Sequence, residues 1–342
     1  MNSNNVRSSN IEFYRIIVML LIVAHHYVVN SGLIEKMQES PLSPQSLFYY
    51  IFGAWGKTGI NCFVLITGYF MCKSQITSKK FLRLLFEVMF YNIVIYSIFV
   101  LSGYEELSIS TLENLIPARS LNTNFVSCFL VFYLCIPFLN VLIHNLDKKK
   151  HLLLICLSLF IYTIHGTIPH THVAMNYVSW FIVLYFISSY LRLYPNKYDK
   201  NIHFWRKGLF LCIFLSILSI IVILWLNENY GKNIPPYKYV SDCNAILALS
   251  IGICSFMYFK SLKIKYSKLI NAIGASTFGV LLIHANSDTM RKWLWTDLFD
   301  NVGHYNDEIF WLRAIIVTLL IFAVCIIIDY IRIQFIEKKF IQ

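Results

Sequence analysis

Long apolar runs separated by short polar segments make up most of this chain. Runs of roughly 17 to 25 residues can cross the hydrocarbon core of a bilayer as α-helices. The pattern therefore predicts an all-α polytopic membrane protein with about ten transmembrane helices. The predicted spans lie near 11–30, 47–72, 84–102, 125–143, 152–168, 174–193, 208–226, 243–259, 269–286 and 309–331.

Charged residues alternate between the loops that join these runs. Most of the 29 Lys and Arg residues lie at the N-terminus, in every second loop and at the C-terminus, whereas the intervening loops are mainly acidic. Because cytoplasmic loops carry an excess of Lys and Arg, we expect both termini to face the cytoplasm. The net charge of +11 therefore indicates topology, and no nucleic-acid partner is predicted.

Composition supports the same class of protein. The chain is 57% hydrophobic and 14% charged, with a mean hydropathy of +0.60, whereas soluble proteins are about 25% charged. Residues 1–342 leave no room for a second soluble domain, so we predict a single multi-pass membrane domain. The nine cysteines form no C-x-x-C pair, and His165, His170 and His172 lack a nearby carboxylate. No metal site is predicted.

The first run, NIEFYRIIVMLLIVAHHYVVN, carries polar side chains that are costly in lipid. Arg15 and His26 are eleven residues apart, about three full turns, so they share one helix face at roughly 16 Å separation along the axis. One interpretation is a polar stripe that lines a functional site. In the other, Arg15 reaches the inner headgroups and His26 is a satisfied core histidine. The shared face favours the first.

Two further segments carry candidate binding residues. In GAWGKTGINCFVLITGYFM, Lys57 and Asn61 enter the second run from its outer side, although this segment also suits close helix packing. In SKKFLRLL, Lys80 and Arg83 lie three residues apart on one helix face. This arrangement suits a phosphate-rich ligand such as a nucleotide, but a topology signal or contact with anionic lipid explains it as well.

The ninth run, STFGVLLIHANSDTMRKWLW, places His284 at a depth similar to that of His26, followed by Asn286 and Arg291. A histidine there could shuttle protons, donate to an oxyanion or make a structural hydrogen bond. The chain lacks the standard sequence motifs for phosphate-binding loops, dinucleotide binding, serine hydrolases and zinc proteases.

Taken together, these segments resemble the integral-membrane acyltransferase family 3, whose bacterial members O-acylate cell-surface glycans and other acceptors. Arg15 and His26 match its pattern of a basic residue, ten residues and a histidine. GKTGINCFVLITGYFM is similar to its second helix, CFLVFYLCIPFLN to its fourth, and TFGVLLIHANSDTMRKWLW to its later histidine segment. Lys80 and Arg83 correspond to its basic pair. The resemblance covers about residues 10–335.

The resemblance implies an O-acetyltransferase that uses acetyl-CoA, or a related acyl-CoA, as donor. The donor would bind from the cytoplasm with its phosphates near Arg15, Lys80 and Arg83. The predicted catalytic residues are His26, Arg15 and His284. His26 would act as a general base or as a nucleophile, and His284 or Asn286 would stabilise the oxyanion or hold His26 in one tautomer. The candidates for contacts with the substrate or the oxyanion are Lys57, Asn61, Asn286 and Arg291.

For the acceptor we expect a surface polysaccharide or its lipid-linked precursor, in the cytoplasmic (inner) membrane of a bacterium. Contacts with membrane lipids follow from the spans. A transporter or flippase is the alternative, in which the same Arg and His would bind substrate or relay protons. That class predicts broken helices and pseudo-symmetric halves, and the sequence shows no pairing of spans one to five with six to ten. A structural membrane scaffold would not need the polar stripe.

Overall fold

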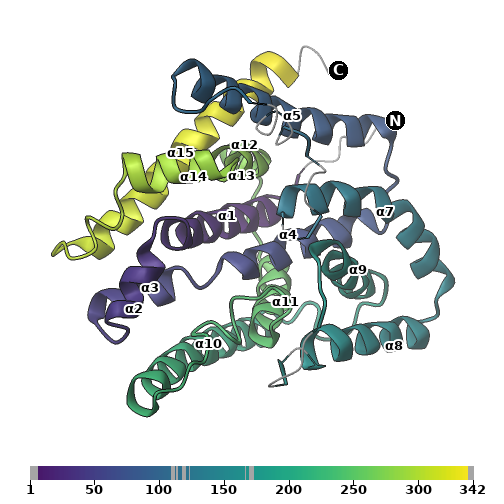
Figure 1. The fold of residues 1–342 in the computed structure, drawn as a ribbon. Coiled ribbons are helices and arrows are strands. Elements are labelled where there is room, and N and C mark those ends of the chain that lie inside the picture. Colours follow the sequence, from purple (N-terminus) through teal and green to yellow (C-terminus); the bar gives the residue numbers. More distant parts are fainter. Residues whose placement is uncertain are drawn as a thin grey trace.

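The computed structural model describes residues 7–108, 112, 115–117, 121–122, 124–165, 167–168 and 173–337. These residues form helices joined by loops and contain no strand, which confirms the all-α prediction (Figure 1). The helices are α1 (Ser9–Val29), α2 (Leu33–Glu39), α3 (Pro44–Phe52), α4 (Gly56–Met71), α5 (Ser78–Leu101), α7 (Phe125–Asn145), α8 (Lys148–Leu159), α9 (Tyr177–Leu193), α10 (Ile202–Tyr230), α11 (Ile246–Ser261), α12 (Lys268–Ala275), α13 (Thr277–His284), α14 (Asp288–Lys292) and α15 (Phe310–Arg332). Three π-helical segments extend α8, α14 and α15: η1 (Phe160–His165), η2 (Trp293–Leu298) and η3 (Ile333–Glu337).

Five helices in the described part of the chain are long and apolar enough to cross a membrane: α1, α5, α7, α10 and α15 with its extension. A sixth span is possible if α12–α13 and α14–η2 form one unit bent by 93°. Two shorter apolar helices, α9 and α11, accompany them. The protein is therefore a multi-pass membrane protein, while the number of ten spans and the cytoplasmic termini stay predictions.

The second predicted run, 47–72, is interrupted between α3 and α4. Glycine allows two close approaches at this break. A Cβ at Gly53 would lie 2.9 Å from Cβ of Val28, and one at Gly56 would lie 2.2 Å from Cγ of His25. The His25 ring also bonds the Gly53 carbonyl oxygen at 2.5 Å. The break therefore brings the start of α4 against the outer part of α1.

Helix α1 lies in the middle of the bundle, where it contacts α4, α11, α12, α13 and α15 (Figure 1). Its side chains Met19, Val23 and Tyr27 are fully buried. Protein rather than lipid surrounds most of α1, and several of its polar side chains, His25 and His26 among them, have partners within the bundle.

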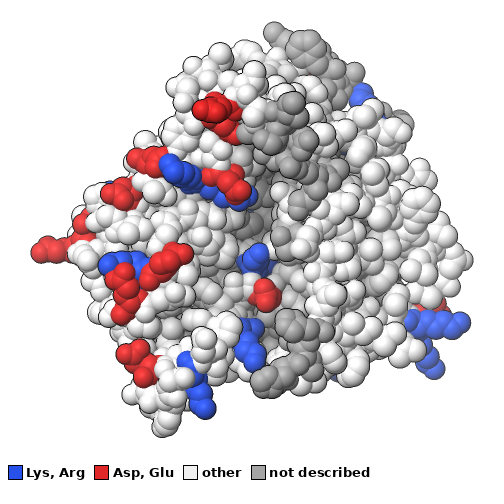
Figure 2. Space-filling model, viewed as in Figure 1, with Lys and Arg blue, Asp and Glu red and all other residues white. Residues whose placement is uncertain are grey.

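Hydrogen bonds and an ion pair join the start of α1 to α11 and α12, and the end of α15 to α5. Ser9 at the start of α1 donates to Asn271 on α12, and Asn10 donates to the Lys260 carbonyl oxygen on α11. Near the start of α5, Glu87 pairs with Arg332 at the end of α15. Figure 2 shows most of the acidic side chains of this face on its left, where α2, α3 and the loop before α15 lie in Figure 1.

Candidate active site

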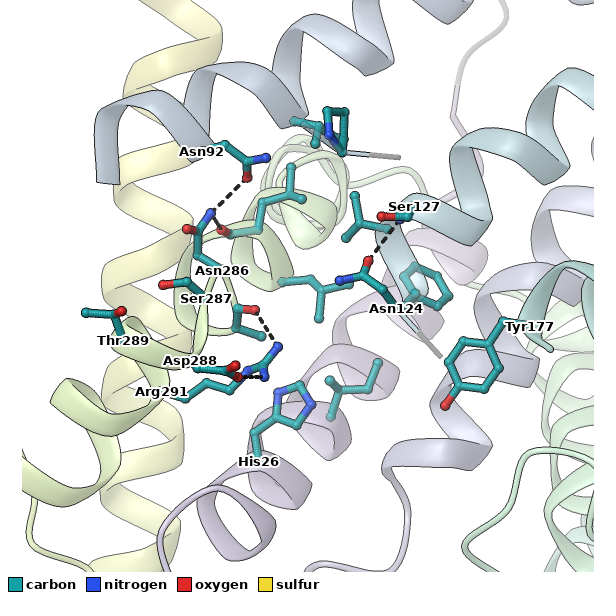
Figure 3. A pocket seen from close by; sticks show the side chains of 18 of the residues that line it. His26, Asn92, Asn124, Ser127, Tyr177, Asn286, Ser287, Asp288, Thr289 and Arg291 are labelled. Carbon is teal, nitrogen blue, oxygen red and sulfur yellow. Dashed lines mark hydrogen bonds and ion pairs between the residues drawn. The ribbon is translucent and has the colours of Figure 1, made fainter. Parts of the chain in front are cut away.

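A cavity of about 610 Å³ lies among α1, α4, α5, α7, α9 and the bend between α13 and α14 (Figure 3). Polar and apolar side chains share its wall about equally. The polar groups include His26, Lys57, Asn92, Tyr177, Asn286 and Arg291. A cavity of this size on which polar groups converge fits a small-molecule site.

Two histidines from opposite ends of the sequence meet at this cavity. His26 Nδ1 lies 2.9 Å from His284 Nε2, and His284 Nδ1 lies 2.6 Å from the Val280 carbonyl oxygen. A carbonyl oxygen only accepts, so His284 Nδ1 carries a proton. In a neutral ring its Nε2 then accepts, and His26 Nδ1 donates to it. The contact therefore leaves the lone pair of His26 on Nε2.

The surroundings favour neutral rings. His284 is fully buried, with the indole of Trp295 packed edge-on at 6.5 Å between ring centroids. A cationic imidazole in such a place would lose hydration without gaining a carboxylate partner. The two histidines that the sequence places at similar depth are thus brought together in a geometry that can activate one nitrogen.

Arg291 is the cation that the α13–α14 bend brings to His26. Its guanidinium donates to Asp288 at 2.5 Å and to the Ala285 carbonyl oxygen at 3.3 Å. Figure 3 shows the guanidinium beside the His26 ring, with its partners Asp288 and Ala285 on the α13–α14 bend. Arg291 therefore places positive charge where an acyl oxygen could gain negative charge during a reaction.

Lys57 reaches the cavity from the first turn of α4. Its Nζ donates to the Tyr177 hydroxyl at 2.5 Å and also lies 5.3 Å from the centre of that ring. The tyrosine keeps its own hydroxyl proton, which an adjacent ammonium polarises. The pair thus offers the cavity a second hydrogen-bond donor.

Asn286 also lines the cavity, but its amide group is oriented by partners. Its Nδ2 donates to Asn92 Oδ1 at 3.1 Å and to the Leu282 carbonyl oxygen at 3.0 Å (Figure 3). Asn92 is fixed in turn because its Nδ2 donates to the Leu115 carbonyl oxygen. Both N–H groups of Asn286 are therefore used, and its free group is a carbonyl oxygen that can accept from a hydroxyl.

Asn61 does not line the cavity. It is fully buried, donates to the Cys243 carbonyl oxygen at 2.7 Å and accepts from Trp180 Nε1 at 2.8 Å. These bonds connect α4 to α9 and to the loop before α11. Its amide is thus engaged at both ends, so we assign it to the packing of the bundle.

The three predicted phosphate ligands lie away from the cavity. Arg15 is on the inner part of α1, and its buried Nε has no hydrogen-bond partner among the described residues. Lys80 donates to the Gln75 carbonyl oxygen at 2.8 Å, and Arg83 forms an ion pair with Glu337. None of the three lines the cavity, and their role in nucleotide binding stays a prediction.

Sequence reasoning missed Tyr177 and Asn92. Each stands in an apolar helix with no local pattern that marks it, and each meets its partner across more than 100 residues of chain. His170 and His172 lie outside the described residues. Among the residues that the structure describes, no group of three His, Cys, Asp or Glu could hold a metal ion.

The fold and the cavity define a multi-pass membrane protein with an internal polar site. Comparison with family models matches residues 8–330 to the acyltransferase domain of acyltransferase family 3. The chain belongs to this family and is a membrane acyltransferase. Neither the curated proteins nor the solved structures give a significant match.

Proposed function

We propose that this protein is an O-acetyltransferase of the bacterial inner membrane, and that His26 carries the chemistry. The donor is acetyl-CoA, and the acceptor is a hydroxyl of a surface polysaccharide or of its lipid-linked precursor. The observation that supports this most directly is the hydrogen bond from His26 Nδ1 to His284 Nε2 at the wall of the cavity. It directs the lone pair of His26 to Nε2, the nitrogen left for the substrate.

In the proposed reaction His26 Nε2 takes the proton of the acceptor hydroxyl. The hydroxyl oxygen then attacks the thioester carbonyl carbon, the C–S bond breaks, and the CoA thiolate takes the proton from His26. Alternatively, Nε2 attacks the thioester first and the acceptor resolves an acyl-imidazole. Both routes use the same lone pair. In either route His284 holds His26 in the required tautomer.

The other polar groups supply charge and orientation. The Arg291 guanidinium and the hydroxyl of Tyr177, polarised by Lys57, are the donors available for the tetrahedral oxyanion. Asn286 offers a carbonyl oxygen that can accept from a second hydroxyl of the acceptor. In this assignment Arg291 and Tyr177 contact the acyl group of the acyl donor, and Asn286 contacts the acceptor.

The donor reaches this cavity from the inner side in our proposal. Arg15 and His26 share one face of α1 at roughly 16 Å along the axis, which is close to the length of an extended pantetheine arm. The nucleotide would remain near Arg15, Lys80 and Arg83, and the thioester would reach His26. Exchange of the Arg83–Glu337 pair for a phosphate contact is part of this proposal.

Two breaks in the predicted spans are also features of the transporter alternative. The α3–α4 break and the 93° bend after α13 are features that a transporter would show. The match of residues 8–330 to an acyltransferase domain supports the enzyme over the transporter.

The test uses membranes that contain wild-type protein, His26→Ala or His203→Ala, given acetyl-CoA with a labelled acetyl group and an envelope glycan fraction. His203 is an exposed histidine at the start of α10 and serves as the matched control. We expect base-labile label in the glycan and release of CoA with wild type and His203→Ala only. Equal labelling by His26→Ala would exclude the proposed mechanism.

A further inference from the structure

A second, strongly apolar groove lies on the lipid side of the wall that contains His284. It has a volume of about 960 Å³ and runs between α5 and α15, with α13 and η2 as its floor. Both α5 and α15 pack against α13. The two helices form the sides of the groove with apolar side chains that include Val94, Ile98, Leu320, Val324 and Ile328.

Polar contacts close both ends of this groove. At the inner end Arg332 pairs with Glu87 at 3.0 Å and with Glu337 at 2.7 Å, which ties α15 and η3 to α5. At the outer end Lys292 donates to Asp297 at 2.9 Å and to Tyr104 at 3.2 Å. The groove is therefore apolar along its length and polar at its ends. This pattern suits a lipid with an apolar chain and a polar headgroup.

The outer rim adjoins the mouth of the catalytic cavity. Arg291 lines the cavity, whereas Met290 and Trp293 on either side of it in sequence line the groove. Helix α14 thus separates the two spaces by the thickness of one helix. Lys292, between Arg291 and Trp293, is two-thirds exposed, and its ammonium donates to both carboxylate oxygens of Asp297 and to the Tyr104 hydroxyl. A phosphate on this rim would meet a cation on the path between groove and cavity.

We propose that the groove holds the apolar tail of the acceptor, and that the acceptor is a saccharide carried on a lipid phosphate. The tail would lie between α5 and α15, the phosphate at Lys292, and the sugar would turn over α14 to reach His26. This inference rests on the proposed acyltransferase function and narrows its acceptor to a lipid-linked saccharide. An acyl chain of the donor is a poorer occupant, because the donor enters from the inner side, where the Arg332 ion pairs close the groove.

The direct test is photo-crosslinking of the purified full chain in lipid nanodiscs. The probe is a long-chain isoprenoid phosphate with a photoreactive diazirine in its tail, and the labelled peptides are mapped by mass spectrometry. Val324→Trp fills the groove. Val222→Trp on α10 is its matched control, because the two valines are 46% and 44% exposed and Val222 lines neither the groove nor the cavity.

We expect label on α5 and α15, at least a fivefold loss in Val324→Trp and no loss in Val222→Trp. Excess unlabelled isoprenoid phosphate should compete, and excess phosphatidylglycerol should not. Equal competition by phosphatidylglycerol would show an ordinary bilayer lipid in the groove and overturn the proposal. Label spread evenly over the lipid-facing helices would overturn it too.

His26→Ala separates this inference from the proposed function. Its groove should crosslink as in wild type, while acetyl transfer is lost. If His26→Ala keeps transfer, the proposed function fails although the crosslinking result stands. If transfer depends on His26 but the groove does not label, the lipid-linked acceptor fails and the enzyme remains.

Discussion

His26 donates from Nδ1 to His284 Nε2 at 2.9 Å, although 258 residues separate the two positions. The bond from His284 Nδ1 to the Val280 carbonyl oxygen at 2.6 Å sets the direction of this contact. A carbonyl, a first histidine and a second histidine thus form a chain that ends at His26 Nε2. It is a neutral counterpart of the arrangement in which a carboxylate orients a catalytic histidine.

The first prediction concerns the role of His284 as an acceptor. His284→Gln can still accept from His26 Nδ1 through its side-chain oxygen, whereas His284→Leu cannot. We expect His284→Leu to lower kcat by about 10²-fold or more and His284→Gln to retain a clearly larger share of it. The measurement is kcat and KM for acetyl transfer in membranes with matched protein levels. Equal losses in the two variants would show that accepting the hydrogen bond is not the role of His284.

The second prediction concerns the contact between α1 and α4. Gly56→Ala would put a Cβ 2.2 Å from Cγ of His25, so the helices must separate and His26 must move with α1. We expect a reduced yield of folded protein and loss of transfer in the remainder. His25→Gly combined with Gly56→Ala removes the Cβ, Cγ and Cδ2 atoms that the new Cβ would meet and should recover folded yield, measured by size-exclusion chromatography in detergent. A wild-type yield for Gly56→Ala alone would contradict the close approach.

The third prediction concerns the buried ion pairs at the inner end of α15. Arg332 is 3% exposed and pairs with Glu87, Asp329 and Glu337. Arg332→Gln leaves three carboxylates without their shared cation, which should cost about 3 to 5 kcal/mol. Arg206→Gln, at an exposed position on α10, should change stability by less than about 1 kcal/mol. Thermal unfolding in detergent compares the two, and similar shifts would argue against a structural role for the Arg332 cluster.

The fourth prediction separates packing from substrate binding at Asn61. Asn61→Ala leaves Trp180 Nε1 and the Cys243 carbonyl oxygen without their partner, which should cost about 1 to 3 kcal/mol each. We expect a lower midpoint of thermal unfolding, with KM for acetyl-CoA and for the acceptor close to wild type in the folded protein. A large rise in either KM at unchanged stability would return Asn61 to the substrate site.

Five membrane-spanning helices and the shared helix face of Arg15 and His26 follow from local patterns. Apolar length predicts α1, α5, α7, α10 and α15, because a continuous run of this size has few other stable forms in lipid. The helix period places Arg15 and His26 on one face. The similar depth of His26 and His284 is an estimate from span boundaries, and in the structure the two rings are in contact.

What the sequence did not predict depends on partners that are distant along the chain. The break before Gly56 is hidden in a continuous apolar run, since only the close approach of His25 requires the glycine. Tyr177 resembles any aromatic residue of an apolar helix until Lys57 meets it. Asn61 looked like a site residue because a polar group in a span suggests function, whereas Trp180 and Cys243 satisfy it.

The most direct test of the account is a double-mutant cycle on the rate of acetyl transfer, with wild type, His26→Ala, His284→Leu and the double variant. If His284 acts only through His26, the double variant transfers acetyl at the rate of His26→Ala, because no oriented lone pair remains to lose. We predict that equality, with His26→Ala at the background of empty membranes. Transfer well above background in His26→Ala, or a further loss on adding His284→Leu, would contradict the assignment of Nε2 of His26 as the reacting group.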